Sequence, residues 1–392
     1  MTSINASETI FDFSKQVAPL SIIAMDSMSA LGKKIDNYLT LWSGNSPAYQ
    51  ADTFLVEVDC PRFSTGDGKG MIKQTIRGND IFILVDVGNY NCKYKMYGKE
   101  VPMSPDDHYC DLKRIIQAAS GKGHRITVIM PLLYGGRQHR RNYRESLDCA
   151  VALQELERMG VTNIITFDAH DPRVQNAIPL MGFDNVRPTY QVLKALLRRH
   201  DDIILDPQHL MIVSPDEGAL NRNMYYSSVL GVDMGMFYKR RDYSKVINGR
   251  NPIVAHEYLG ASVEGKDIFI SDDIIASGES MLDLAYELKK RKANRIFASA
   301  TFTLFTGGLE LFDKAYKDGA ITGVLGTNLT YITPECRERE WFIEVDVSKY
   351  ISYIIAAINH DFSVSIALNP LERIQILTEK YKQAQREKGI IV

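Results

Sequence analysis

The sequence predicts an α/β protein of two domains, each built on a mainly parallel sheet flanked by helices. Short apolar segments recur about 20 to 40 residues apart, and amphipathic segments with helical spacing separate them, as in parallel strands joined by crossover helices. The pattern restarts after a linker-like stretch near Pro179–Pro188. At 392 residues the chain is long for one domain and sufficient for two substantial cores.

The first half begins with residues 22–41, which we expect to form one helix, and with a glycine-rich loop at Cys60–Gly70. Strands and helices then alternate: strand Ile81–Val87, helix Asp107–Ala119, strand Ile126–Met130, helix Ser146–Met159 and strand Ile164–Phe167.

The second half repeats this alternation and ends in two amphipathic helices. The expected elements are helix Tyr190–Arg198, strand Leu210–Val213, a helix from Gly218, strand Met234–Tyr238, strand Ile268–Ile270, a helix from Met281, strands Ile296–Phe302 and Gly323–Leu325, and helices around Tyr350–Ile358 and Pro370–Glu387.

Composition excludes several classes of protein. Charged residues make up 24% and apolar residues 45%, which is typical of a soluble globular protein. A net charge of −2 gives no support for a nucleic-acid partner, and no apolar run approaches the ~20 residues of a membrane span. The start resembles no signal peptide, and the five cysteines form no Cys-x-x-Cys pair, so we expect reduced thiols in a cytoplasmic protein.

One segment in the second half has the composition of a sugar-phosphate site. Asp272 and Asp273 follow the strand Ile268–Ile270, and Ser277, Gly278 and Ser280 lead into the next helix. Backbone N–H groups at such a turn suit a phosphate, and paired carboxylates suit vicinal sugar hydroxyls. The alternative is that a serine or aspartate only caps the helix, with no ligand present.

Four further motifs follow expected strands, at the sheet edge where open α/β sheets bind ligands. Their side chains suit the binding of polyphosphate and of a divalent cation, and the stabilisation of developing negative charge. The alternatives without a ligand are an exposed basic loop for the arginines and a structural role for the histidine. The four are Arg137–Gln138, Asp168 with His170 and Asp171, Asp216 with Arg222, and Lys239–Arg241 before a polar stretch over 242–251 that we interpret as a lid.

In this order the motifs resemble those of the ribose-phosphate diphosphokinases, which make phosphoribosyl diphosphate from ATP and ribose 5-phosphate. The resemblance runs from about Phe63 to Tyr350. It rests on seven motifs in the family's order: Arg62–Gly66, Ile76–Gly78, Arg137–Gln138, Asp168–His170, Ser214–Asp216, Lys239–Arg241 and Asp272–Ser280.

The resemblance implies a role for each matching residue. ATP would be bound by Phe63, Asp67, Arg137 and Gln138, the first two serving a neighbouring subunit. Mg²⁺ would be held by His170 and Asp216. The catalytic residues would be Lys239, Arg241 and His170. Ribose 5-phosphate would be bound by Asp272, Asp273, Ser277, Gly278 and Ser280.

The resemblance also implies the architecture and the assembly. We expect two phosphoribosyltransferase-like domains, an ATP-binding domain over residues 1–185 and a ribose-5-phosphate-binding domain over 186–360, with a helical extension over 361–392. The family implies a homo-oligomer, built from dimers up to a hexamer.

Several positions depart from the family pattern. Thr65 stands where the family has an aspartate, and Asp67 stands where it has a glutamate, which is one methylene longer. His139 follows Arg137–Gln138 where an aspartate is usual. Ala276 stands where an acid is usual, and Phe302 where a histidine is common.

The expected function is transfer of the β,γ-diphosphoryl group of MgATP to the 1-hydroxyl of ribose 5-phosphate, giving phosphoribosyl diphosphate and AMP. The departures keep two alternatives open. One is a non-catalytic regulatory relative that binds nucleotide or an active homologue. The other is a phosphoribosyltransferase, which would share the Asp272–Ser280 segment.

Overall fold

The computed structural model describes residues 11–44, 51–141, 143–241 and 253–390, without the side chains of residues 239–241, 253–256, 366 and 367. The chain forms two compact units. Unit 1 consists of Met1–Arg187, Asn328–Tyr331 and Asp346–Asn369. Unit 2 consists of Pro188–Thr327, Ile332–Val345 and Pro370–Val392.

The C-terminal quarter is distributed differently from our expectation. The division after Arg187 lies two residues from the expected boundary at 185/186, but Asp346–Asn369 belongs to unit 1 rather than to the second domain or a separate extension. The reason is its helix α9 (Ser348–Asn359), which is apolar on most sides and packs against α1 (Ser29–Ser43). Residues 370–392 belong to unit 2.

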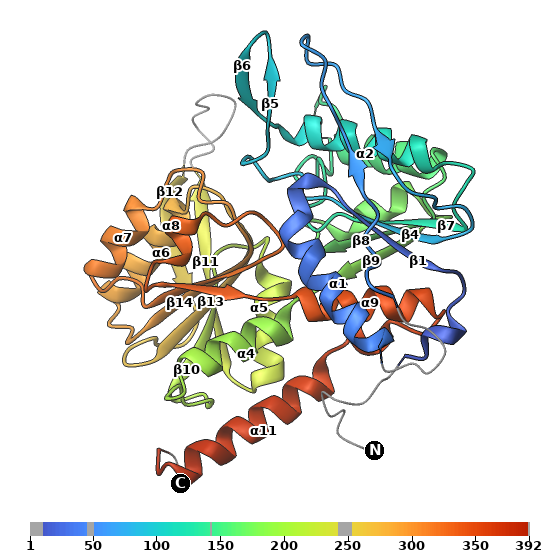
Figure 1. The fold of residues 1–392 in the computed structure, drawn as a ribbon. Helices are drawn as coiled ribbons and strands as arrows, with labels where there is room; N and C mark the ends of the chain where they lie inside the picture. Colours follow the sequence, from blue (N-terminus) through green and yellow to red (C-terminus); the bar gives the residue numbers. More distant parts are fainter. Residues whose placement is uncertain (1–10, 45–50, 142, 242–252, 391–392) are drawn as a thin grey trace. The chain divides into compact units, whose positions relative to one another are not determined.

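Unit 1 contains a fully parallel sheet of five strands, drawn from blue to green in Figure 1. In sheet order the strands are β1 (Leu20–Ala24), β4 (Asp80–Leu84), β7 (Arg125–Ile129), β8 (Asn163–Phe167) and β9 (Gly182–Val186). Its other elements are α1, α2 (Pro105–Ala119), α3 (Asp148–Arg158), α9, α10 (Ser365–Leu368), the hairpins β2–β3 (Val58–Asp59, Met71–Ile72) and β5–β6 (Lys93–Met96, Lys99–Pro102), and the 3₁₀ helices η1 (Phe13–Lys15), η2 (Asp26–Met28) and η3 (Pro172–Ala177).

Two expectations for unit 1 were wrong. Residues 22–41 are not one helix, because Leu20–Ala24 forms β1 and pairs with β4 before α1 begins. The stretch Pro179–Pro188 is not a linker, because it contains β9, the polar edge strand of the sheet.

Unit 2 contains a seven-stranded sheet that is parallel except at one edge. In sheet order the strands are β12 (Ile253–Leu259), β11 (Asp233–Arg241), β10 (Leu210–Ser214), β13 (Asp267–Ile275), β14 (Ile296–Thr303), β15 (Gly323–Thr327) and β16 (Phe342–Val345), with β12 antiparallel to β11. The helices are α4 (Thr189–Arg199), α5 (Leu220–Leu230), α6 (Glu279–Lys290), α7 (Glu310–Lys317), α8 (Pro334–Arg337) and α11 (Leu371–Glu387). The expected α/β fold class is confirmed in both units.

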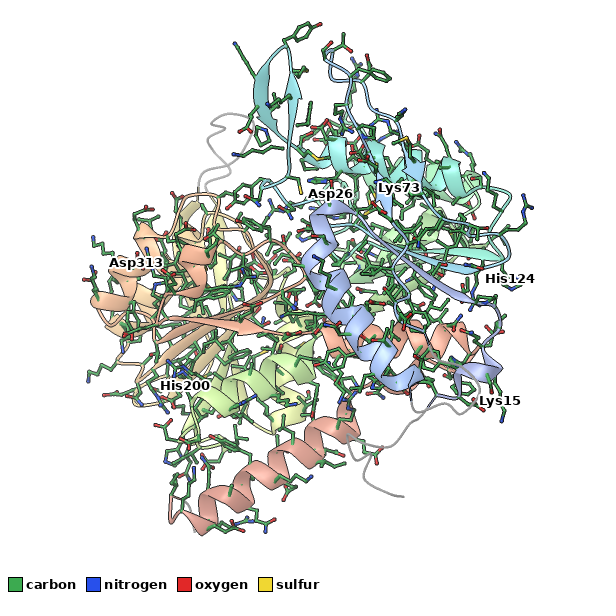
Figure 2. The ribbon with its side chains drawn as sticks, viewed as in Figure 1. Lys15, Asp26, Lys73, His124, His200 and Asp313 are labelled. Carbon is green, nitrogen blue, oxygen red and sulfur yellow. The ribbon has the colours of Figure 1, made fainter. Side chains whose placement is uncertain are left out.

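The last helix, α11, is anchored to unit 2 by polar contacts. The Tyr381 hydroxyl lies 3.0 Å from the carbonyl oxygens of both His200 and Ile203, and the Gln385 amide donates to Ile203 and Asp201. His200 ends α4 and is labelled in Figure 2. These bonds fix α11 against the turn that precedes β10.

All five cysteines are free thiols, and Cys149 is buried in the core of unit 1, as expected. In the part of the chain that the structure describes, no helix is both long and apolar enough to cross a membrane.

Candidate active site

The two adjacent aspartates of unit 2 lie where β13 extends beyond the end of its neighbour β10. β13 pairs with β10 only up to Ile270, whereas its pairing with β14 continues to Ile275. Asp272 and Asp273 therefore stand within β13, not after it as we expected, on a stretch that β10 leaves uncovered. The carboxyl edge of a parallel sheet is where such a fold exposes polar groups to a ligand.

A buried asparagine makes hydrogen bonds to the backbone of β13 just beyond the end of β10. Asn223 on α5 is fully buried, and its amide donates to the Ser271 carbonyl at 2.8 Å and accepts from the Ser271 N–H at 3.1 Å. The backbone hydrogen bonds between β10 and β13 end at Ile270, and the two bonds from Asn223 satisfy the backbone of the next residue, Ser271. The strand is therefore held rigid immediately before its two carboxylates. Sequence reasoning missed Asn223, because one asparagine in a helix gives no local signal.

Charge at the aspartate pair is only partly compensated. Burial raises the pKa of Asp272, and the Asp273 carboxylate next to it raises that pKa further. The Asp273 N–H donates to Asp272 Oδ1 at 2.8 Å, and Arg222 Nη1 lies 3.6 Å from the same oxygen. Both of these contacts oppose the rise. Arg222, which we expected to return toward this edge, does so.

The turn after β13 requires glycine at position 278. Gly278 has φ +89° and precedes the first residue of α6. A Cβ atom there would lie 2.2 Å from the ring of Phe312, which is fully buried against Trp341 and Phe305. Only glycine fits both the backbone and the space.

No side chain caps α6, so its first N–H groups keep the anion-binding property of a helix N-terminus. Ser277 is half-buried in the turn, and Ser280 is exposed in the first turn of the helix. The alternative interpretation, a serine or aspartate that serves only as a cap, is thus not what the described contacts show.

The remaining candidate residues of unit 2 lie at the ends of β10 and β11, the strands on the side of β13 opposite to β14. Asp216 follows β10, and its Oδ1 accepts the Ala219 N–H at 3.1 Å, which ties the carboxylate to the start of α5. The backbone of Lys239 and Arg241 closes β11, three residues beyond the strand end that we expected. Their side chains and the expected lid over 242–251 lie outside the described residues.

In unit 1, the loop Cys60–Gly70 exposes the aromatic ring of Phe63. The Phe63 N–H donates to the Asp67 carbonyl at 2.7 Å, and the Thr65 hydroxyl donates to the Asp67 carboxylate at 2.8 Å. The base of the loop is fixed by a buried bidentate pair of Arg62 with Asp111, both bonds 2.8 Å. Phe63 itself is 58% exposed, which is unusual for a phenylalanine held on an ordered loop.

The expected ATP ligands Arg137 and Gln138 lie on the loop after β7. Arg137 is exposed, whereas the Gln138 side chain donates to the Ser146 carbonyl at 2.9 Å. Gly135 makes the loop tight: its φ is +65°, and a Cβ there would lie 2.9 Å from the Cys149 amide at the start of α3.

The end of β8 turns sharply to present His170. Asp168 adopts φ +43°, a left-handed conformation that aspartate tolerates better than most residues, and its buried carboxylate lies 3.9 Å from Arg187. Sequence reasoning missed Arg187, the last residue of unit 1 before the division. His170 is exposed, and its ring centroid lies 5.3 Å from that of His139 on the loop after β7.

The donor set for a divalent cation is small. Within the described ranges no group of three or more histidine, cysteine, aspartate or glutamate side chains is placed to hold a metal. The two expected ligands, His170 and Asp216, belong to different units. Each side chain by itself suits a cation whose other ligands come from phosphate oxygens or water.

Comparison with known proteins gives consistent results over most of the chain. Residues 20–160 match the family model for the N-terminal domain of ribose phosphate pyrophosphokinase, and residues 184–318 match the phosphoribosyl transferase domain. The ribose-phosphate pyrophosphokinase of Vibrio cholerae is 27% identical over 312 residues, which cover 79% of this chain and 90% of that protein. That of Ralstonia nicotianae is 26% identical over 299 residues, covering 73% and 86%.

A solved structure shares the fold. The crystal structure of phosphoribosylpyrophosphate synthetase from Mycobacterium smegmatis superposes with a TM-score of 0.70 at 18% identity, covering 87% of this chain and 99% of that one.

Proposed function

The chain belongs to the ribose-phosphate pyrophosphokinase family, and from this premise we propose that it transfers the β,γ-diphosphoryl group of ATP to the 1-hydroxyl of ribose 5-phosphate. The observation that carries the proposal is the end of β13, where two carboxylates precede a turn that leads into a helix without a side-chain cap. The family match and this geometry support an enzyme, not a purely binding protein.

Ribose 5-phosphate binds to unit 2 in this proposal. Asp272 and Asp273 accept hydrogen bonds from the 2- and 3-hydroxyls of the sugar, and the 5-phosphate rests on the backbone of the Ser277–Ser280 turn with both serine hydroxyls as further donors. Because Asn223 fixes β13 and Gly278 fixes the turn, the pentose is held in one orientation.

ATP binds through residues of unit 1. Arg137 pairs with phosphate oxygens, and Gln138 keeps the loop closed through its bond to Ser146. The exposed ring of Phe63 contacts the adenine of a neighbouring subunit, with Asp67 beside it, so the protein works as a homo-oligomer. Thr65 occupies part of the hydrogen-bonding capacity of Asp67, and we propose that this relaxes the preference for adenine.

The reaction is an in-line displacement at the β-phosphorus. The 1-hydroxyl oxygen forms the new bond, the bond from the β-phosphorus to the oxygen shared with the α-phosphate breaks, and AMP leaves with that electron pair. The hydroxyl proton passes to solvent. We assign no general base, since Ala276 replaces the acid expected there.

Charge neutralisation and positioning supply most of the rate. Lys239 and Arg241 donate to the phosphate oxygens as negative charge develops on them, and His170 acts on the same charge through the cation that it would hold. A divalent cation, Mg²⁺ as the family resemblance implies, would be held by His170 and Asp216 and would offset the charge of the β- and γ-phosphates.

The direct test is Lys239→Ala. Losing one donor to the transition state costs about 10²–10³ in rate, so AMP formation dependent on ribose 5-phosphate should fall by that factor while the melting temperature stays unchanged. Lys314→Ala, which removes an exposed lysine of α7, is the control and should keep the parental rate. Equal rates in the Lys239 variant and the parent would mean that the assigned role is wrong.

The same assay separates the proposal from its alternatives. Mass detection of phosphoribosyl diphosphate and AMP from the two substrates alone excludes a purely regulatory protein. It also excludes a phosphoribosyltransferase, which would need a base and would consume phosphoribosyl diphosphate.

A further inference from the structure

Two histidines of unit 1 meet where β7 and β8 end. His139 comes from the loop after β7 and His170 from the loop after β8, and their ring centroids lie 5.3 Å apart with planes inclined by 57°. The His139 side chain is only 15% exposed, and its Nδ1 atom is buried without a hydrogen-bond partner among the described residues. Leaving a buried polar atom unpaired costs about 1–3 kcal/mol. A ligand bound to this nitrogen would offset that cost.

The spacing of the two rings fits a shared metal ion. Imidazole nitrogens bind zinc-like cations at about 2.0–2.1 Å, so ring centres about 1.2 Å farther out lie roughly 5 Å apart on one tetrahedral ion. The observed 5.3 Å matches this separation. A stacked or edge-to-face pair without a ligand would leave Nδ1 of His139 unexplained.

The other nitrogen of His139 faces a carboxylate. His139 Nε2 lies 3.7 Å from Asp171 Oδ2, and Asp171 is held in place by Arg173, whose Nε donates to it at 2.9 and 3.1 Å. A carboxylate behind one ring nitrogen, with the other nitrogen directed at the metal, is the usual arrangement around a metal-binding histidine. Asp171 thus lies on the Nε2 side of the ring, which leaves Nδ1 as the candidate coordinating atom.

The donor type sets the class of cation. In the family that this chain resembles, the position of His139 is usually an aspartate, an oxygen donor suited to Mg²⁺. Here two imidazoles are present, and imidazole favours later first-row cations such as Co²⁺, Ni²⁺ and Zn²⁺ over Mg²⁺. No third metal-ligating side chain joins them in the described ranges, so water or phosphate oxygens complete the coordination.

We propose that His139 and His170 form a two-imidazole site for a divalent transition-metal cation at the end of unit 1. Binding of the cation stands on the geometry of unit 1 alone. Its use as the cation of the nucleotide rests on the proposed function.

The test is Co²⁺ binding by the full-length, untagged protein after chelator treatment, at pH 7.5 and without substrates. We expect one Co²⁺ per chain by calorimetry, with visible absorption bands of nitrogen-ligated cobalt, and no displacement by a tenfold excess of Mg²⁺. His139→Ala and His170→Ala should each weaken binding at least about tenfold, because even loss of an outer partner of a ligand costs about 10–100-fold.

Two further variants make the test specific. His139→Asp restores the oxygen donor and should reduce the preference for Co²⁺ over Mg²⁺ while preserving the fold. His124→Ala removes an exposed histidine that precedes β7, at the opposite end of the strand (labelled in Figure 2), and should bind Co²⁺ as the parent does.

The inference is overturned if the parent binds no Co²⁺, if Mg²⁺ displaces it readily, or if the His139 variants bind it as tightly as the parent. The proposed function is tested separately. If the protein turns over with Mg²⁺ but the His139 variants bind Co²⁺ as the parent does, only the proposed metal site is refuted. If the protein binds Co²⁺ but forms no AMP, only the proposed reaction is refuted.

Discussion

Replacing Asp272 by asparagine should stabilise the protein and remove its affinity for ribose 5-phosphate. Asparagine keeps the oxygen that accepts the Asp273 N–H at 2.8 Å but carries no charge. Folding raises the pKa of the Asp272 carboxyl from 3.8 to about 7, so above pH 7 the native state holds a charge that its surroundings disfavour. At about 1.4 kcal/mol for each pKa unit, this opposes folding by at most about 4 kcal/mol.

The expected gain is smaller than this limit. The Asp272 side chain is 26% exposed, so solvent screens part of the charge. We expect about 2 kcal/mol at pH 8, or a melting temperature higher by about 4–8 °C for a unit of this size. The gain should shrink as the pH falls below 7 and vanish only well below pH 3.8, where the wild-type carboxyl is protonated in both the folded and the unfolded state.

The assay is thermal denaturation of both proteins at pH 4.5 and pH 8, with calorimetric titration of ribose 5-phosphate at pH 8. Asp283→Asn, an exposed aspartate on α6, is the control and should change neither quantity. An Asp272→Asn protein that is no more stable than the parent at pH 8, or equally more stable at both pH values, would refute the electrostatic reasoning. Unchanged affinity for the sugar phosphate would refute the site.

Two other substitutions test how the site is held. Asn223→Ala leaves both the N–H and the carbonyl of Ser271 unpaired in the interior, so the free energy of unfolding should fall by about 2–3 kcal/mol and the KM for ribose 5-phosphate should rise. Urea denaturation and steady-state kinetics measure the two effects. Gly278→Ala places a methyl group 2.2 Å from Phe312 at φ +89° and should abolish binding of the sugar phosphate. Gly319→Ala, at φ +70° with open space around it, should cost only the backbone strain of about 1–2 kcal/mol and keep binding intact.

Local sequence predicted the motif-bearing strands of both units but not their full lengths. The apolar run of β13 is interrupted by Asp272 and Asp273, so the strand was expected to end at Ile270. It continues to Ile275 because β14 still pairs with it on one side, a tertiary effect that a single segment does not reveal.

The two wrong expectations in unit 1 have the same cause. Leu20–Ala24 has apolar residues that suit a buried strand or a buried helix, and only its pairing with β4 decides between them. In β9 the edge position permits polar residues, so the alternation that marks a strand is lost, and the prolines on either side read as a linker.

The candidate site shows the same division. Residue type and order were enough to nominate the carboxylates, the turn and the histidines. The residues that hold them could not be predicted, because Asn223 and Arg187 act through contacts with segments distant in sequence or carry no pattern of their own.

Unit 1 has a consequence for how the protein is made, since all five strands of its sheet lie within residues 20–186 whereas residues 346–369 supply its last helices. Asn359 donates to buried Asp80 at 3.0 Å, and Arg125, which pairs with the same aspartate, also donates to the Ile358 carbonyl. During synthesis, the five strands of this sheet are therefore complete before the buried Asp80 and its partner Arg125 can bond to residues 358 and 359. A premature stop near residue 340 would therefore remove helices of unit 1 as well as the end of unit 2.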